Sequence, residues 1–443
     1  MALFSILSLL FLSLLRPSTS IGVNYGTLAD NLPPATQVAS FLKQHTFIDA
    51  IKIFNADHAI IGAFANTNIA VTVTVPNGEI PALSKIRRAR AWVAANIVPF
   101  FPATKITCIA VGNEIIYSGD KNLIVNLLPA MKNIHHALKR AGITTIKVST
   151  PNTLGFLAAS DPPSTGRFKD AYERVILSPM LAFLRETKSP FMINPYPYFA
   201  FYDKTLNYAI FKPNPGKFDA ATGIKYTSMF DAMLDAVYTA MKRIGYGDVE
   251  IVVAETGWPS IGDPNQMGVS VENAASYNGN LIRHVTSGKG TPLMPGRKFE
   301  TYVFSLFNEN LKPGSTAERN FGLFKPDLTP VYDVGIMRGQ SGGPAPTPTT
   351  PSGSAHKWCV AKQGISAQSL QSNIDYVCSS GIDCKPIQAG GPCFLPNTIQ
   401  AHASYVMNAY YQSKGRNNFN CDFSNTGVIT TSNPSSGSCK YSF

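Results

Sequence analysis

Short buried-strand patterns alternate with helical patterns along most of this 443-residue chain. The strand candidates are eight apolar runs, at residues 21–26, 50–55, 69–76, 106–114, 146–152, 191–198, 250–258 and 300–308. Helical periodicity lies between several of them, at residues 80–98, 122–141, 171–187, 227–244 and 271–287. This alternation predicts an α/β fold, a (β/α)8 TIM barrel. A doubly wound sheet is the alternative, but no glycine-rich phosphate turn follows the first strand.

The composition of the remaining segments divides the chain into domains. Residues 339–356 are rich in Pro, Thr, Ser and Gly, and they predict an extended linker. The linker separates a barrel domain at residues 21–338 from a small module at residues 357–443. Residues 1–20 indicate a secretory signal peptide, because they stay apolar to Leu15 and end in the small residues Ser18 and Ser20. Their first residues depart from the usual pattern in lacking a basic side chain.

The N-terminal segment and the net charge limit where the protein can be located and what it can bind. The apolar run at the N-terminus is too short for a membrane-spanning helix, so we expect a secreted protein of the extracellular space or the cell wall. The formal net charge is +11, yet the densest basic cluster is Arg87-Arg88-Ala-Arg90 in a predicted helix. We therefore expect no nucleic-acid partner, and we interpret the charge as solubility or as retention in an acidic wall matrix. We expect a monomer.

The seven cysteines fall into two groups. Cys108 stands alone in an apolar run and predicts a buried, inert thiol. The other six lie in the predicted module, at Cys359, Cys378, Cys384, Cys393, Cys421 and Cys439. In a secreted chain they indicate a disulfide framework, although their spacing leaves the pairing open. A zinc site is the alternative, but no Cys-x-x-Cys spacing supports it.

Two glutamates end buried strand patterns, Glu114 on the fourth and Glu255 on the seventh. A parallel barrel brings all carboxyl strand ends to one face, so both side chains are expected at its mouth. Glycoside cleavage uses two carboxyl groups, about 5–5.5 Å apart for retention and about 6.5–9.5 Å apart for inversion. The sequence does not give their separation. An ion-paired structural role is the alternative for Glu255.

Other polar and aromatic residues follow the same strands. Asn113 directly precedes Glu114 and is placed to bind a sugar hydroxyl. Flat rings for sugar binding are supplied by Tyr25, Tyr196, Tyr198, Trp258 and Phe307. Core packing is the alternative for each ring taken singly. The histidines are scattered and no Gly-x-Ser-x-Gly motif is present, so we expect no metal, no cofactor and no serine hydrolase chemistry.

Four motifs carry a resemblance to a known family: Ile21-Gly-Val-Asn-Tyr-Gly26, Ala110-Val-Gly-Asn-Glu114, Val253-Ala-Glu-Thr-Gly-Trp-Pro-Ser260, and Phe307-Asn-Glu-Asn310 with Phe321-Gly-Leu-Phe324. From about Ile21 to Val334 the chain resembles the plant family 17 glycoside hydrolases, the glucan endo-1,3-β-glucosidases. The resemblance implies hydrolysis of (1→3)-β-D-glucan with retention, Glu114 as acid/base and Glu255 as nucleophile. It also implies supporting roles for Tyr25, Asn113, Glu300, Glu309 and Lys312.

The tail resembles a second family through Trp358-Cys-Val360, Gly391-Pro-Cys-Phe394, His402-Ala-Ser-Tyr405, Asn408-Ala-Tyr-Tyr-Gln412 and Cys421-Asp-Phe423. It is similar to the family 43 carbohydrate-binding module, which binds β-1,3-glucan. This resemblance implies the disulfides Cys359–Cys421, Cys378–Cys384 and Cys393–Cys439. Such two-module chains resemble the olive-pollen allergen type. A glucan transglycosylase and a non-catalytic glucan-binding wall protein are the alternatives.

Overall fold

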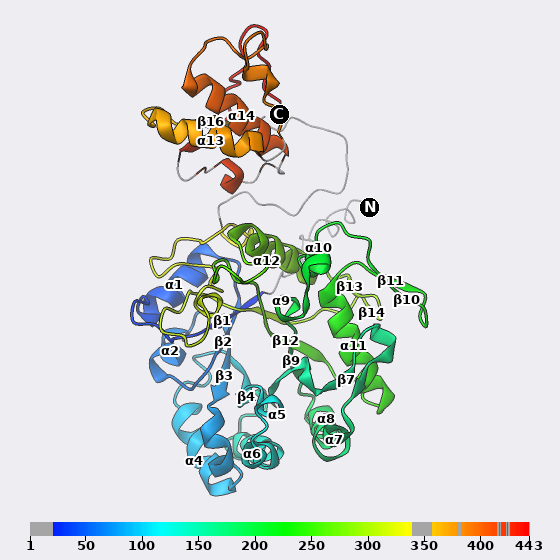
Figure 1. The fold of residues 1–443 in the computed structure, drawn as a ribbon. Coiled ribbons are helices and arrows are strands. Elements are labelled where there is room, and N and C mark those ends of the chain that lie inside the picture. The colour runs from blue at the N-terminus through cyan, green and yellow to red at the C-terminus, as the bar shows by residue number, and fades with distance from the viewer. Residues whose placement is uncertain are drawn as a thin grey trace, which may run out of the picture. The chain divides into compact units, whose positions relative to one another are not determined.

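The computed structural model describes residues 21–338, 357–379, 382–413, 416, 418–421, 423 and 426–442 (Figure 1). The chain separates into two compact units, Met1–Pro344 and Ala345–Phe443. The division between them falls within residues 339–356, the predicted linker. That segment and the predicted signal peptide at residues 1–20 lie outside the described residues.

The first unit is built on one parallel sheet of nine strands in the order β5-β4-β3-β2-β1-β15-β12-β9-β6. The strands are β1 (Gly22–Tyr25), β2 (Ala50–Ile53), β3 (Ala70–Val75), β4 (Ile106–Val111), β5 (Lys147–Ser149), β6 (Pro151–Thr153), β9 (Phe191–Asn194), β12 (Ile251–Thr256) and β15 (Thr301–Val303). Only Thr150 separates β5 from β6, so the two ends of the sheet are halves of one interrupted strand. The sheet therefore closes, and the predicted barrel is confirmed.

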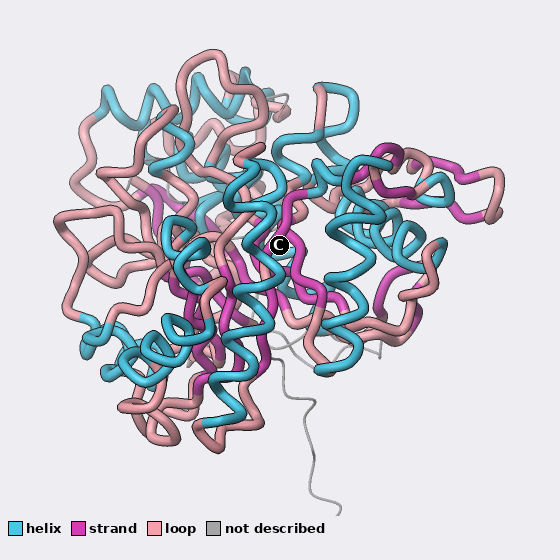
Figure 2. Tube along the Cα trace, turned by 90° about the horizontal axis from the view of Figure 1, so that it is seen from below, coloured by secondary structure: helices cyan, strands magenta, loops and turns pink. Residues whose placement is uncertain are grey.

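Helices surround this sheet in both views (Figures 1 and 2). The longer ones are α1 (Ala35–His45), α4 (Ile86–Asn96), α6 (Lys121–Arg140), α8 (Ser178–Thr187), α11 (Met229–Arg243) and α12 (Val271–Thr286). The shorter ones are α2 (His58–Ala63), α3 (Ile80–Leu83), α5 (Ile115–Ser118), α7 (Asp170–Tyr172), α9 (Pro197–Ala200) and α10 (Leu206–Ala209). Antiparallel pairs are added by β7 (Leu157–Ala159) with β8 (Arg167–Phe168), β10 (Lys217–Asp219) with β11 (Ile224–Tyr226), and β13 (Gly290–Thr291) with β14 (Met294–Pro295).

The sequence pattern of α6 explains why a helix forms there. Leu127, Met131, Ile134 and Leu138 recur at helical spacing and are all buried. The helix begins where the Asp120 carboxylate accepts hydrogen bonds from two backbone amides of the first turn. Two other predicted helices are interrupted. Residues 80–98 break between α3 and α4, where Lys85 is extended, and residues 171–187 contain a π-helical turn at Glu173–Leu177.

The barrel strands are shorter than their apolar patterns predict at the carboxyl ends. β4 ends at Val111, because Gly112 and Glu114 both have positive φ, 72° and 57°. A left-handed residue cannot continue a strand, so the chain turns outward there. β9 and β15 likewise stop before the polar residues that follow them. These residues therefore lie on turns above the barrel and are free to form a site.

Buried side chains from several strands pack together in the barrel. One cluster consists of Ala50, Cys108, Met192, Val252, Ala254 and Tyr302. Gly22 is needed beside this cluster, because a Cβ there would lie 2.6 Å from the Tyr302 ring. Burial in this cluster raises the pKa of the Cys108 thiol, and the predicted burial of this cysteine is confirmed.

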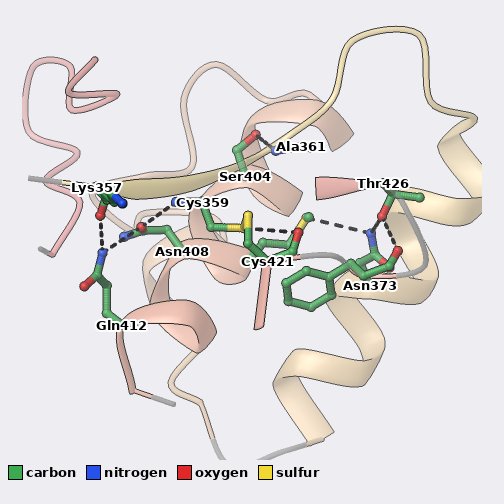
Figure 3. The surroundings of a disulfide bond; sticks show 11 residues. Lys357, Cys359, Ala361, Asn373, Ser404, Asn408, Gln412, Cys421 and Thr426 are labelled. Carbon is green, nitrogen blue, oxygen red and sulfur yellow. Dashed lines mark hydrogen bonds between the residues drawn. A yellow bond between two sulfur atoms is a disulfide. The ribbon is translucent and has the colours of Figure 1, made fainter. Parts of the chain in front are cut away.

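The C-terminal unit contains the antiparallel strands β16 (Trp358–Ala361) and β17 (Gly427–Thr430) and the helices α13 (Ala367–Ser379) and α14 (Ile399–Ser413). Its core includes the Cys359–Cys421 disulfide, beside which α14 binds β16 (Figure 3). Asn408 accepts a hydrogen bond from the Cys359 amide, and Ser404 accepts one from the Ala361 amide. The other disulfides are Cys378–Cys384 and Cys393–Cys439. This is the pairing that the resemblance implies.

None of the helices in the described parts of the chain has the length and apolar character that crossing a membrane requires.

The disulfides of the C-terminal unit should contribute unequally to its stability. Cys359–Cys421 closes a loop of 62 residues and Cys378–Cys384 a loop of 6. Because loop-closure entropy grows with loop length, replacing both cysteines of the first pair by alanine should lower the free energy of unfolding by about 4 kcal/mol, and of the second by about 2 kcal/mol. Hydrogen exchange of α13 and α14 in the full chain, measured against urea concentration, checks this order. Equal losses would contradict it.

Candidate active site

A cavity of about 910 Å³ opens at the carboxyl ends of the barrel strands, and both Glu114 and Glu255 line it. Its walls come from residues that follow β1, β2, β4, β6, β9 and β15, together with Glu255 near the end of β12. The closed parallel sheet brings these segments together, although they are far apart in the sequence. The structure thus brings the two predicted carboxylates into one cavity.

Glu255 is held from two sides in a buried position. Its side chain is 7% exposed, and Lys52 Nζ lies 2.8 Å from Oε1. The Tyr196 hydroxyl, which follows β9, donates to the other carboxylate oxygen at 3.1 Å. Burial and the neighbouring Glu255 carboxylate hold the pKa of Tyr196 well above its usual value, so this hydroxyl stays protonated and remains a donor. Each oxygen of Glu255 therefore has a fixed partner.

Lys52 is a site residue that the sequence patterns did not single out. It lies in the middle of β2 with its side chain fully buried, and its ammonium also stands 4.0 Å from the centroid of the Phe54 ring. Burying an ammonium is costly unless it is paired, and Glu255 supplies the pair. A lysine inside the apolar run Ala50-Ile-Lys-Ile53 was the available signal. Its direction into the barrel depends on the register of β2.

Glu114 is held by its backbone as well as by its side chain. Its amide donates to the Pro151 carbonyl of β6 at 2.9 Å, and its φ of 57° turns it out of the strand line. Asn194 Nδ2 donates to Oε1 at 2.8 Å. Burial, followed by the charge of Glu255, raises the pKa of Glu114 above its usual value, and the Asn194 hydrogen bond acts in the opposite direction. The two carboxylates therefore differ in environment, since only Glu255 has a direct cation partner.

Asn113 is fixed beside Glu114 by an amide that the sequence patterns did not predict. Asn77 accepts a hydrogen bond from the Asn113 amide at 2.8 Å and donates to its carbonyl at 3.1 Å. The side-chain oxygen of Asn113 has no hydrogen-bond partner among the described residues, and the same holds for that of Asn194. Both residues line the cavity, although these two oxygens are themselves buried.

A second set of polar residues faces the cavity from the segment after β15. Glu309 accepts a hydrogen bond from the Leu28 amide at 2.9 Å, and Lys312 pairs with Glu318 at 3.2 Å. Gly26 is required here, because a Cβ would lie 2.3 Å from the Glu309 carboxylate. All four of Gly26, Glu309, Lys312 and Glu318 line the cavity. The family resemblance implied Glu309 and Lys312 but not Glu318, which lies in a 3-10 helix at Thr316–Arg319 where no strand pattern is present.

Four predicted aromatic residues do not line the cavity. Trp258 is fully buried and donates to the Gly268 carbonyl, and Tyr198 packs against its ring. Tyr25 and Phe307 are buried against each other, with ring centroids 6.0 Å apart. These rings support the walls of the site from behind. Tyr196 is the one member of the predicted aromatic set found among the described lining residues.

Glu300 must be corrected as a site residue. It immediately precedes β15, at the amino end of the strand, whereas the cavity lies at the carboxyl ends. It is exposed, and its carboxylate accepts a hydrogen bond from Tyr302 at 2.6 Å. The apolar run at residues 300–308 placed it on the correct strand, but the strand direction puts it at the opposite end of the barrel.

Comparison with known proteins matches residues 21–336 to the glycosyl hydrolases family 17 and residues 357–428 to the X8 domain. A glucan endo-1,3-beta-glucosidase of Triticum aestivum is 54% identical, with 96% of this chain and 95% of the relative covered. A glucan endo-1,3-beta-D-glucosidase of Olea europaea is 48% identical, with 95% and 93% covered. The solved structure of CJP38, a beta-1,3-glucanase and allergen of Cryptomeria japonica pollen, is 45% identical with a TM-score of 0.68 and covers 71% of this chain and 98% of its own.

Removing one partner of the Lys52–Glu255 ion pair should destabilise the barrel more than removing both charges together. Replacing Lys52 by Met leaves a buried carboxylate without its cation, so the free energy of unfolding should fall by about 3–5 kcal/mol. The same replacement in a Glu255→Gln background should cost much less, because no charge remains unpaired. Urea unfolding followed by tryptophan fluorescence measures both differences. A loss of equal size in the two backgrounds would show that the charge pair is not its source.

Proposed function

The chain belongs to glycosyl hydrolase family 17, and we propose that it is a secreted, endo-acting retaining hydrolase of (1→3)-β-D-glucosidic linkages in β-1,3-glucans such as callose and laminarin. The relatives of Triticum and Olea, covered over most of their length, carry that activity in their names. The observation that carries the proposal is that Glu114 and Glu255 line one cavity in unlike environments. Two carboxyl groups with different tasks are what glycoside hydrolysis requires.

In the first step, Glu114 gives its proton to the bridging oxygen while Glu255 attacks the anomeric carbon. The raised pKa of Glu114 supports the role of acid, because it keeps the carboxyl protonated above the usual range of a glutamate. The role of nucleophile is supported by the partners of Glu255, since Lys52 and Tyr196 orient both oxygens. The product of this step is a glycosyl ester on Glu255 and a released sugar chain.

In the second step, water attacks the anomeric carbon of the ester, the bond from that carbon to Glu255 breaks with its electron pair returning to the carboxylate, and Glu114 takes a proton from the water. Formation of the ester removes the charge of Glu255, which is one cause of the raised pKa of Glu114. Glu114 therefore becomes a better base at the point where one is needed. Asn194 orients Glu114 through its hydrogen bond to Oε1, and Asn113 lines the cavity beside it. Glu309, Lys312 and Glu318 extend this polar wall.

The C-terminal X8 region, which resembles the family 43 carbohydrate-binding module, would bind the same glucan. A binder tethered to a hydrolase raises the effective concentration of substrate at an insoluble surface. We also propose a monomer, because the two carboxylates and the side chains that hold them need no second copy of the chain. The presence of both carboxylates counts against a glucan-binding protein without activity. Transfer of the glycosyl group to another sugar would use the same residues, and product analysis on laminarin separates it from hydrolysis.

Glu255→Gln should lower kcat on laminarin by about 10³-fold or more, because the nucleophile is lost, while glucan binding persists. Reducing-sugar release and a laminarin pull-down measure the two properties. Glu300→Gln is the matched control, since its carboxylate lies at the other end of the barrel, and it should keep wild-type activity. Proton NMR of the first products of the wild type should show the β-anomer. Activity retained in Glu255→Gln would exclude the assignment.

The raised pKa of Glu114 predicts a pH dependence. Glu114 must be protonated in the first step, so kcat/KM should fall as the pH rises through its folded pKa. Asn194→Ala removes a hydrogen bond that lowers this pKa. The alkaline limb of the kcat/KM profile should therefore move to higher pH in the variant, whatever happens to the maximal rate. A limb that stays in place or moves to lower pH would contradict the role of Glu114.

A further inference from the structure

The cavity crosses the mouth of the barrel and differs in character from one side to the other. Its charged side follows the neighbouring strands β1, β2 and β15 and includes Glu309, Lys312 and Glu318. The opposite side follows β4, β6 and β9, which are neighbours once the sheet closes. We call this the neutral side, lined by Tyr117, Thr153, Leu154, Gly155, Phe199 and Met233. None of these described residues carries a charge.

Tyr117 is the most prominent member of the neutral side. It lies on α5, three positions after Glu114, and its side chain is 72% exposed. Its ring rests on the backbone of Gly155, since a Cβ at that position would lie 3.2 Å from Cδ2 of the ring. The Gly155 amide donates to the Thr153 hydroxyl at 3.2 Å, which fixes this support. Phe199, also exposed, packs against Tyr196 with ring centroids 5.3 Å apart. Two aromatic rings are thus held in place and uncovered in one cavity.

The position of Glu114 gives the neutral side a direction along the substrate. Glu114 follows β4 and directly precedes α5, which carries Tyr117, so it lies beside the neutral side, whereas Glu255 is on β12, between β15 of the charged side and β9 of the neutral side. The bridging oxygen that Glu114 protonates stays with the sugar that departs. We infer that the neutral side binds the departing sugar units of the glucan, with Tyr117 as their stacking platform. This inference rests on the proposed function and adds which side of the cleft binds the departing part of the glucan.

The chemistry of the neutral side fits that occupant. The apolar face of a pyranose ring can pack on an aromatic ring, and no charged group has to be desolvated there. The same surface can hold a sugar acceptor in the second step. Its hydroxyl oxygen then forms the new bond to the anomeric carbon, the ester bond breaks, the electron pair returns to Glu255, and the hydroxyl proton passes to Glu114. Tyr117 therefore also influences whether a sugar or water accepts the glycosyl group from Glu255.

Two donors with different leaving groups test the assignment. Laminaripentaose releases a sugar that must occupy the departing side, whereas laminaribiosyl β-fluoride releases fluoride and leaves that side empty. Tyr117→Ala should lower kcat/KM on laminaripentaose by about tenfold, because a stacking contact is lost. On the fluoride its kcat/KM should stay within about twofold of the wild type. Tyr117→Phe keeps the ring and should restore the value on laminaripentaose.

Phe218 provides the matched control. It is an exposed aromatic residue of the same unit, on β10, and does not line the cavity. Phe218→Ala should leave both substrates unaffected. The inference is overturned if Tyr117→Ala lowers kcat/KM on both donors equally, or if it changes neither. Failure of the proposed function is distinct, because wild-type protein would then release no oligosaccharides from laminarin and no fluoride from the second donor.

Discussion

The burial of the Glu255 carboxylate at the barrel mouth is the constraint on which the site depends. A carboxylate so little exposed to water is stable in its charged form only beside a partner, and here a fully buried lysine and a tyrosine hydroxyl provide one for each oxygen. Lys52 comes from β2 and Tyr196 follows β9, strands that face one another only across a closed barrel. The charge pair is therefore formed by the fold, and the fold must close before the carboxylate can be held.

The two carboxylates acquire different properties from their surroundings rather than from their chemistry. Glu255 has a direct cation partner, whereas Glu114 has the neutral amide of Asn194 and lies within the field of Glu255. Burial and that field act together to keep a proton on Glu114. Such a difference between two like residues is what allows one to act as acid while the other acts as nucleophile. Under the proposed mechanism, loss of the Glu255 charge would remove one cause of the raised pKa of Glu114.

The C-terminal unit solves a different problem of stability. Its described residues form two short strands, two α-helices and two 3-10 turns around a small core, so little apolar area is buried. Three disulfides offset this shortage, and Cys359–Cys421 lies within the core itself. Side chains of α14 also bind the β16 backbone. The barrel needs no such links, because its sheet closes on itself and buried side chains pack together inside it.

The sequence alone determined the barrel, the cysteine-rich module and the placement of Glu114 and Glu255 at carboxyl strand ends. These depend on the local order of apolar and polar residues, which a linear pattern records. Only the tertiary structure decided which neighbours share a surface. Lys52 lies in a strand buried on both faces, where the pattern does not say which side chain points inward. Trp258 follows the same strand as Glu255 yet packs behind the cavity wall, and Glu300 lies at the wrong end of its strand. The orientation of each side chain and its contacts are set when the barrel closes, because only closure brings residues from separate strands close enough to interact.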